Sequence, residues 1–151
     1  MEERDEQVRR MQDIYANAMN VIVWLGGFEE PQDSNRHIGM ENWGIDRLDP
    51  CTQDKAREAL DLADHLRRYW DYLSSSPTDL MQAPSYEQQK LQDRRIWAQL
   101  SRIFYRPWFE RLWVIQELGL AKRPLALWGN LLFPWENLRD GALFMLRPSF
   151  M

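Results

Sequence analysis

The alternation of apolar and polar residues along the chain predicts an α/β protein with predominantly helical content. In five stretches, apolar residues recur every three or four positions, as they do on one face of an α-helix. These predicted helices cover residues 2–19, 53–73, 86–104, 107–121 and 135–146. Two continuous apolar runs, Val21–Leu25 and Leu125–Trp128, predict strands, because each is short and is closed by glycine.

The run Val21–Leu25 predicts a strand that is buried on both faces, as is usual in a parallel sheet. A helix, a short turn and a buried strand together make half of an α/β crossover unit. Only two such strands are evident in the sequence, and a two-stranded sheet is marginally stable in water. We therefore expect that further strands are missing at the amino end.

The segment 106–118 combines large aromatic and aliphatic residues with two arginines and two glutamates. Pro107 fits the first turn of a helix, where a missing N–H is harmless, and Gly119 marks the end of that helix. Glu110 lies four residues after Arg106, so an ion pair between these two side chains is expected.

Glu117 stands out on the same predicted helix. Its neighbours three and four positions away are all apolar: Trp113, Val114, Leu120 and Ala121. A carboxylate in an apolar stripe is unfavourable unless a partner pairs with it or it takes part in chemistry. Two interpretations are open: a structural glutamate, hydrogen-bonded to a neighbouring loop or solvated at the edge of the stripe, and a functional carboxylate.

Length, charge and cysteine content limit the class of protein. The 151 residues suffice for one domain, and the net charge of −4 argues against a general binder of nucleic acid or membrane surfaces. The single cysteine, Cys51, excludes an internal disulfide and fits a reducing compartment. No cysteine–histidine spacing indicates a metal site, no apolar run is long enough to span a membrane, and the acidic amino terminus is unlike a signal peptide. A cytoplasmic or nuclear location is therefore expected.

Two blocks of the sequence resemble the fungal heterokaryon-incompatibility (HET) domain. Glu3-Arg4-Asp5-Glu6-Gln7-Val8, Met11, Ile14-Tyr15, Ala18 and Val21-Ile22-Val23-Trp24-Leu25-Gly26 resemble the second conserved block of that family. Arg106-Pro107-Trp108-Phe109-Glu110-Arg111-Leu112-Trp113-Val114-Ile115-Gln116-Glu117 resembles its third block. The first block of the family is absent. The resemblance predicts one amino-terminally truncated domain over 1–151, with a variable insertion at about 28–95.

The resemblance implies a role in non-self recognition and regulated cell death. It also implies a partial three-layer fold like that of the Toll/interleukin-1 receptor (TIR) domain, a flavodoxin-like arrangement with few short parallel strands. The window Trp113–Leu118 is similar to the Trp-Cys-x-x-Glu-Leu motif of TIR domains, whose glutamate cleaves NAD. By this analogy Glu117 is the catalytic carboxylate, Trp113 stacks on a ring of NAD, and Arg106 or Arg111 meets the pyrophosphate. NAD is then a substrate, and no bound cofactor or metal is expected.

Whether the chain is an enzyme is left open by the resemblance. One alternative is a non-catalytic signalling module that self-associates through exposed aromatic residues and the long loop Phe28–Thr52. In either case a homo-oligomer or a regulatory protein partner is expected. Another alternative is an inactive fragment that does not fold alone, since a sheet without its first strands has an open edge.

Overall fold

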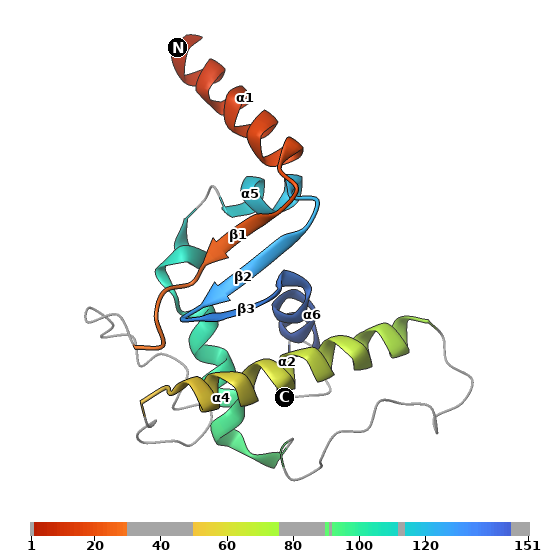
Figure 1. Cartoon of the computed structure of the whole chain (residues 1–151). Coiled ribbons are helices and arrows are strands. Elements are labelled where there is room, and N and C mark those ends of the chain that lie inside the picture. The colour runs from red at the N-terminus through yellow and green to blue at the C-terminus, as the bar shows by residue number, and fades with distance from the viewer. Residues whose placement is uncertain (1, 30–49, 76–89, 91, 112–113, 146–151) are drawn as a thin grey trace.

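The computed structural model of the chain describes residues 2–29, 50–75, 90, 92–111 and 114–145. Helices and strands follow one another along the chain as shown in Figure 1. They are α1 (Glu2–Asn17), β1 (Val21–Trp24), α2 (Gln53–Ser74), α4 (Arg94–Phe104), the 3-10 helix η3 (Pro107–Glu110), α5 (Val114–Leu120), β2 (Pro124–Trp128), β3 (Leu131–Pro134) and α6 (Trp135–Met145). This order confirms the mostly helical α/β class. Most of the predicted loop Phe28–Thr52 and the first residues of the helix predicted over 86–104 lie outside the described residues.

The sheet has three strands in the order β1-β2-β3. β1 and β2 are parallel, and the helices α2, α4 and α5 lie between them in the chain, so the expectation of short parallel strands is confirmed for this pair. β3 is antiparallel to β2 and was not predicted. The turn that joins these two strands is Gly129–Asn130, and Gly129 has the positive φ of 58° that two-residue hairpin turns require.

Small residues allow α2 and α6 to pack closely. Thr52 caps α2 by accepting a hydrogen bond from the Lys55 N–H at 3.4 Å. Ala63 and Leu66 on α2 lie so close to Gly141 on α6 that a side chain at that glycine would stand 3.8–3.9 Å from them. The α2 stripe and α6 thus form one side of the core.

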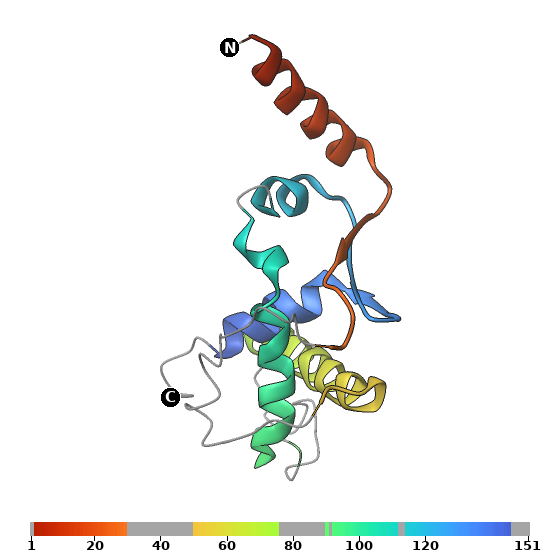
Figure 2. The same ribbon diagram turned by 90° about the vertical axis from the view of Figure 1, so that its left-hand side faces the viewer.

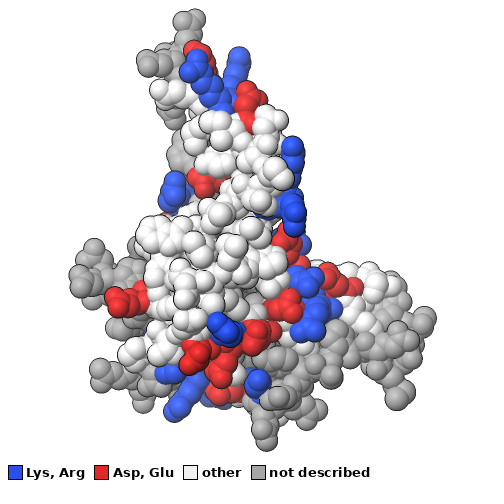
Figure 3. Space-filling model, viewed as in Figure 1, with Lys and Arg blue, Asp and Glu red and all other residues white. Residues whose placement is uncertain are grey.

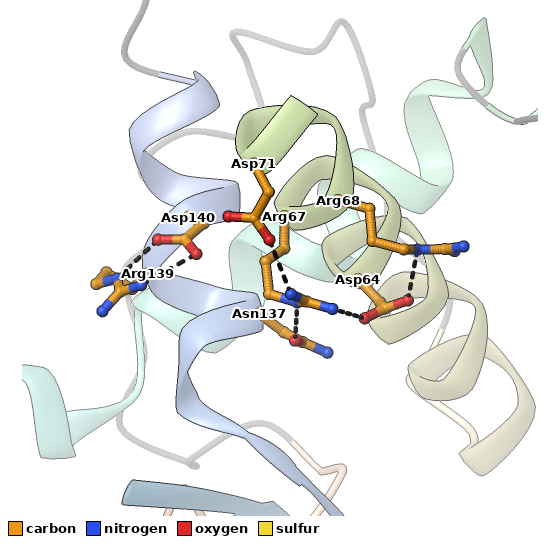
Figure 4. A network of polar contacts seen from close by, with 7 residues as sticks. All are labelled: Asp64, Arg67, Arg68, Asp71, Asn137, Arg139 and Asp140. Carbon is orange, nitrogen blue, oxygen red and sulfur yellow. Dashed lines mark hydrogen bonds and ion pairs between the residues drawn. The ribbon is translucent and has the colours of Figure 1, made fainter. Parts of the chain in front are cut away.

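Polar side chains flank this helix pair, as shown in Figure 4. The Arg67 guanidinium on α2 donates to Asn137 Oδ1 on α6 at 3.0 Å and to the Asp64 and Asp71 carboxylates of its own helix. On α6, Arg139 donates to both oxygens of the buried Asp140 carboxylate, at 2.7 and 3.1 Å. Hydrogen bonds therefore give partners to the buried side chains of Asn137 and Asp140.

The sheet is covered on one face by the described helices, and the prediction of a β1 strand buried on both faces is wrong. Val21 and Val23 point into the core, whereas Ile22 and Trp24 are exposed. Figure 2 shows α4, α5 and α6 on the same side of the strands. The described residues therefore form two layers, and the predicted third layer is not among them. The apolar run Val21–Leu25 therefore forms a strand with one face in the core and a second, apolar face exposed to solvent.

Candidate functional site

The segment expected to form one helix over 107–121 forms two short helices, so that prediction is wrong. Arg106 is extended, as a residue before proline is expected to be, and η3 begins at Pro107. Arg111 is extended again at φ −83° and ψ 124°, which separates η3 from α5. Just before the break, the buried Trp108 ring stands edge-on to Trp135 of α6, with 5.2 Å between ring centroids.

Glu117 lies on α5 and is buried, with 9% of its surface exposed. Arg111 Nη2 lies 3.5 Å from Glu117 Oε1, and the Tyr15 side chain of α1 lies near the same carboxylate. Burial raises the pKa of Tyr15, and the charge of Glu117 and the hydrogen bond to it raise this pKa further. The carboxylate therefore lies beside the polar side chains of Tyr15 and the exposed Arg111, rather than in a purely apolar setting. These contacts agree with the structural interpretation of Glu117.

Arg106 lies apart from these three residues. Its Nη1 donates to the Glu29 carbonyl oxygen at 2.7 Å, and its Nη2 donates to that of Phe28 at 3.3 Å. The guanidinium carbon also lies 5.9 Å from the centre of the Trp128 ring, a cation–π contact. Arg106 thus links the end of β2 to the segment that follows β1.

The structure brings together two of the four predicted site residues. Glu117 and Arg111 are in contact, whereas Arg106 lies beside the carboxyl ends of β1 and β2. Trp113 lies outside the described residues. Figure 1 places α5 beside the amino-terminal ends of β1 and β2. Open α/β sheets usually bind ligands at the other end, beside the carboxyl ends of the strands.

Sequence reasoning missed Tyr15 as a neighbour of Glu117. Tyr15 falls on the apolar stripe of α1, and nothing in its spacing shows that its hydroxyl meets Glu117, a residue far along the chain. No local pattern could have found this contact, since it exists only when α1 lies on α5.

A second group of polar residues surrounds Cys51 near the start of α2. Burial raises the pKa of the Cys51 thiol, and the positive charges of Arg102, Arg106 and Lys55 act in the opposite direction. Arg102, itself buried on α4, donates to Gln99 at 3.0 Å. Because the net shift is upward, the thiol is not activated as a nucleophile.

No helix within the described ranges is long and apolar enough to cross a membrane. In the same part of the chain, no three histidine, cysteine, aspartate or glutamate residues are grouped so that they could hold a metal ion.

Comparison with known proteins identifies the family. The model of the family described as "Heterokaryon incompatibility protein (HET)" matches residues 1–117. The chain is also 34% identical over 121 residues to "Heterokaryon incompatibility protein 6, OR allele" of Neurospora crassa, an alignment that covers 80% of this chain and 17% of that protein. The chain belongs to the HET family. It spans about a sixth of the length of that relative, and no solved structure matches it significantly.

Proposed function

We propose that this chain acts in heterokaryon incompatibility, as part of an effector that responds to non-self and triggers regulated cell death. Membership of the HET family and the similarity to a heterokaryon incompatibility protein support this role. The chain covers a small share of that relative. That a non-self trigger activates it and that a partner protein controls it are therefore parts of the same proposal.

The chemistry we propose is hydrolysis of NAD with Glu117 as the catalytic carboxylate. The observation that carries this proposal is the buried carboxylate held by Tyr15 and Arg111 on a motif similar to that of TIR domains. The parallel pair β1–β2 and its helical crossover support the proposed relation to TIR and flavodoxin-like folds. That relation is an analogy between folds, so the enzymatic function needs a direct test.

In this reaction the bond between C1′ of the ribose and the nicotinamide nitrogen breaks, and its electron pair leaves with nicotinamide. The ribose carbon becomes oxocarbenium-like, and a nearby carboxylate stabilises its positive charge. Water then bonds to C1′ and loses a proton, which Glu117 can accept, giving ADP-ribose. In this proposal Arg111, which contacts Glu117, holds the carboxylate or meets a phosphate.

Access to Glu117 requires a movement of α1. With 9% of its surface exposed and Tyr15 against it, the carboxylate cannot touch a ribose in the arrangement shown. α1 extends away from the rest of the molecule in Figures 1 and 2 and contacts the body at α5. Displacing α1 would therefore uncover Glu117 without unfolding the core.

Inducible expression in fungal cells tests the cellular role. We expect induction of the chain, fused to an oligomeric carrier that promotes assembly, to lower both viability and cellular NAD. Glu117→Gln should abolish both effects, and Glu110→Gln, an exposed acid of the same motif, should leave them unchanged. A Glu117→Gln variant that kills as well as the wild type would refute the assignment of Glu117.

A second candidate function is a non-catalytic signalling module that acts by self-association. The exposed apolar side chains of α1 and β1 favour it, because large exposed apolar surfaces mark interaction sites. Light scattering against concentration, run together with a nicotinamide assay, separates the two candidates. Assembly without loss of NAD supports the signalling module, and a thermal melt without a cooperative transition supports an inactive fragment.

A further inference from the structure

β1 is an edge strand, and its outer side pairs with no other strand among the described residues. On the inner side, the Val21 N–H donates to the Arg123 carbonyl at 3.3 Å and the Leu25 N–H donates to the Leu127 carbonyl at 2.9 Å. Alternate residues of a parallel strand turn their backbone groups to the same neighbour. The backbone N–H and C=O groups of Ile22 and Trp24 therefore point to the open edge.

The side chains of the same two residues are also exposed. Ile22 is 57% exposed and Trp24 is 68% exposed, on the sheet face that carries no described helix. Natural edge strands are usually protected by a charged residue, a proline or a bulge. The segment 19–27 contains neither a charge nor a proline, so it lacks two of these protections.

We propose that the open edge binds β1 of a second copy of this chain, antiparallel to the first and centred on Val23. In this register Ile22 of each copy lies opposite Trp24 of the other. These are the two residues whose backbone groups point outward, so each opposed pair can exchange two N–H···O=C bonds. Directly opposite residues also share a face of the sheet, which joins the exposed isoleucines and tryptophans into one apolar surface.

A second copy suits this edge because the pairing is self-complementary and brings no like charges together within 19–27. The four residues of β1 are too few alone, since a stable interface buries about 800 Å² on each partner. Further apolar surface is available next to β1: Ile14 on α1 is 66% exposed, and Met19 in the following turn is 81% exposed. Figure 3 shows a broad uncharged surface over the middle of the molecule, between the charges of α1 and a charged belt below.

The pairing does not depend on the chemistry proposed for Glu117. A dimer can form whether or not NAD is cleaved, and loss of NAD cleavage on substitution of Glu117 leaves the β1 edge untouched. The two proposals can therefore fail separately.

Sedimentation velocity of the full 151-residue chain over a wide concentration range tests the pairing. We expect a monomer–dimer equilibrium for the wild type. Ile22→Lys and Trp24→Glu should each weaken it by at least about tenfold in Kd, since each desolvates an unpaired charge at the interface. An equimolar mixture of the two variants should recover the dimer, because the introduced lysine of one copy then faces the introduced glutamate of the other.

Leu132→Lys is the matched control. Leu132 is 56% exposed, but it lies on β3, which β2 separates from the β1 edge, so its substitution should not change the equilibrium. A wild-type chain that stays monomeric at every concentration would overturn the proposal. Binding of an added peptide strand at the β1 edge would not rescue it, because the proposed occupant is a second copy of the chain. Dimers that are unaffected by both β1 substitutions, or a mixture that does not recover, would overturn it as well.

Discussion

The Arg106 guanidinium donates a hydrogen bond to the Glu29 carbonyl oxygen at 2.7 Å, and these two residues are 77 positions apart in the chain. The same guanidinium holds the Phe28 carbonyl and lies over the Trp128 ring. One buried side chain thus joins the exit from β1, the end of β2 and the turn that begins η3. An arginine in the family-like motif Arg-Pro-Trp-Phe therefore has a structural role in this protein.

Arg106→Lys should lower the free energy of unfolding by about 2–3 kcal/mol, because a lysine cannot donate to both carbonyls in the planar geometry of a guanidinium. Urea unfolding followed by circular dichroism measures this change. Arg10→Lys is the matched control, since Arg10 is exposed on α1 and pairs with Glu6. A midpoint for Arg106→Lys equal to that of the control would contradict the assigned role.

Two glycines should respond to alanine with opposite signs. Gly129 has φ 58°, and a Cβ there would lie 2.5 Å from the Phe28 ring, so Gly129→Ala should destabilise by about 1–2 kcal/mol or more. Gly119 lies within α5 with no atom within 4 Å of an added Cβ, so Gly119→Ala should stabilise by up to about 1 kcal/mol. Thermal melts of the two variants provide the comparison, and equal shifts would be inconsistent with the hairpin geometry.

The thiol of Cys51 should react slowly with iodoacetamide. Burial raises its pKa, so at mildly alkaline pH the reactive thiolate is scarcer than in an exposed cysteine. Because Cys51 is the single cysteine of the chain, the rate of alkylation can be assigned without ambiguity. The rate should rise sharply in denaturing urea, and a native rate equal to the unfolded rate would show that the thiol is not shielded.

Acid should destabilise the fold through His65. Burial lowers the pKa of His65, Arg68 lowers it further, and Asp64 partly opposes them. Below the ordinary value of 6.5 the unfolded chain gains a proton that the folded chain resists, so this contribution to stability is present above pH 6.5 and is lost as the pH falls. The urea midpoint should therefore drop more on acidification through that pH in the wild type than in His65→Gln, and equal drops would exclude His65.

The sequence pattern predicted those helices and strands that bury one face in the core, because burial of one face fixes the spacing of their apolar residues. The apolar stripe of α2 and the two strands that pair in parallel, β1 and β2, follow from local spacing. β3 was missed because its short apolar run leads directly into Pro134 and α6. Its pairing with β2 depends on the turn at Gly129, which brings the two strands together.

The candidate site was less predictable than the fold, for a physical reason. The burial of Glu117 followed from its apolar neighbours along the helix. Its polar contacts with Tyr15 and Arg111 depend on how α1 lies on α5 and on the extended backbone at Arg111, and periodicity encodes neither feature. The same limitation applies to Arg106, whose partners Phe28 and Glu29 come from the beginning of the insertion.

The most direct measurement of the central proposal is nicotinamide release by the purified, oligomerised chain incubated with NAD. The account predicts release by the wild type and by Glu110→Gln, and a loss of at least about 100-fold in Glu117→Gln. The melting temperatures of both variants serve as the control for folding. No release by the wild type in its assembled state, or equal release by Glu117→Gln, would contradict the account.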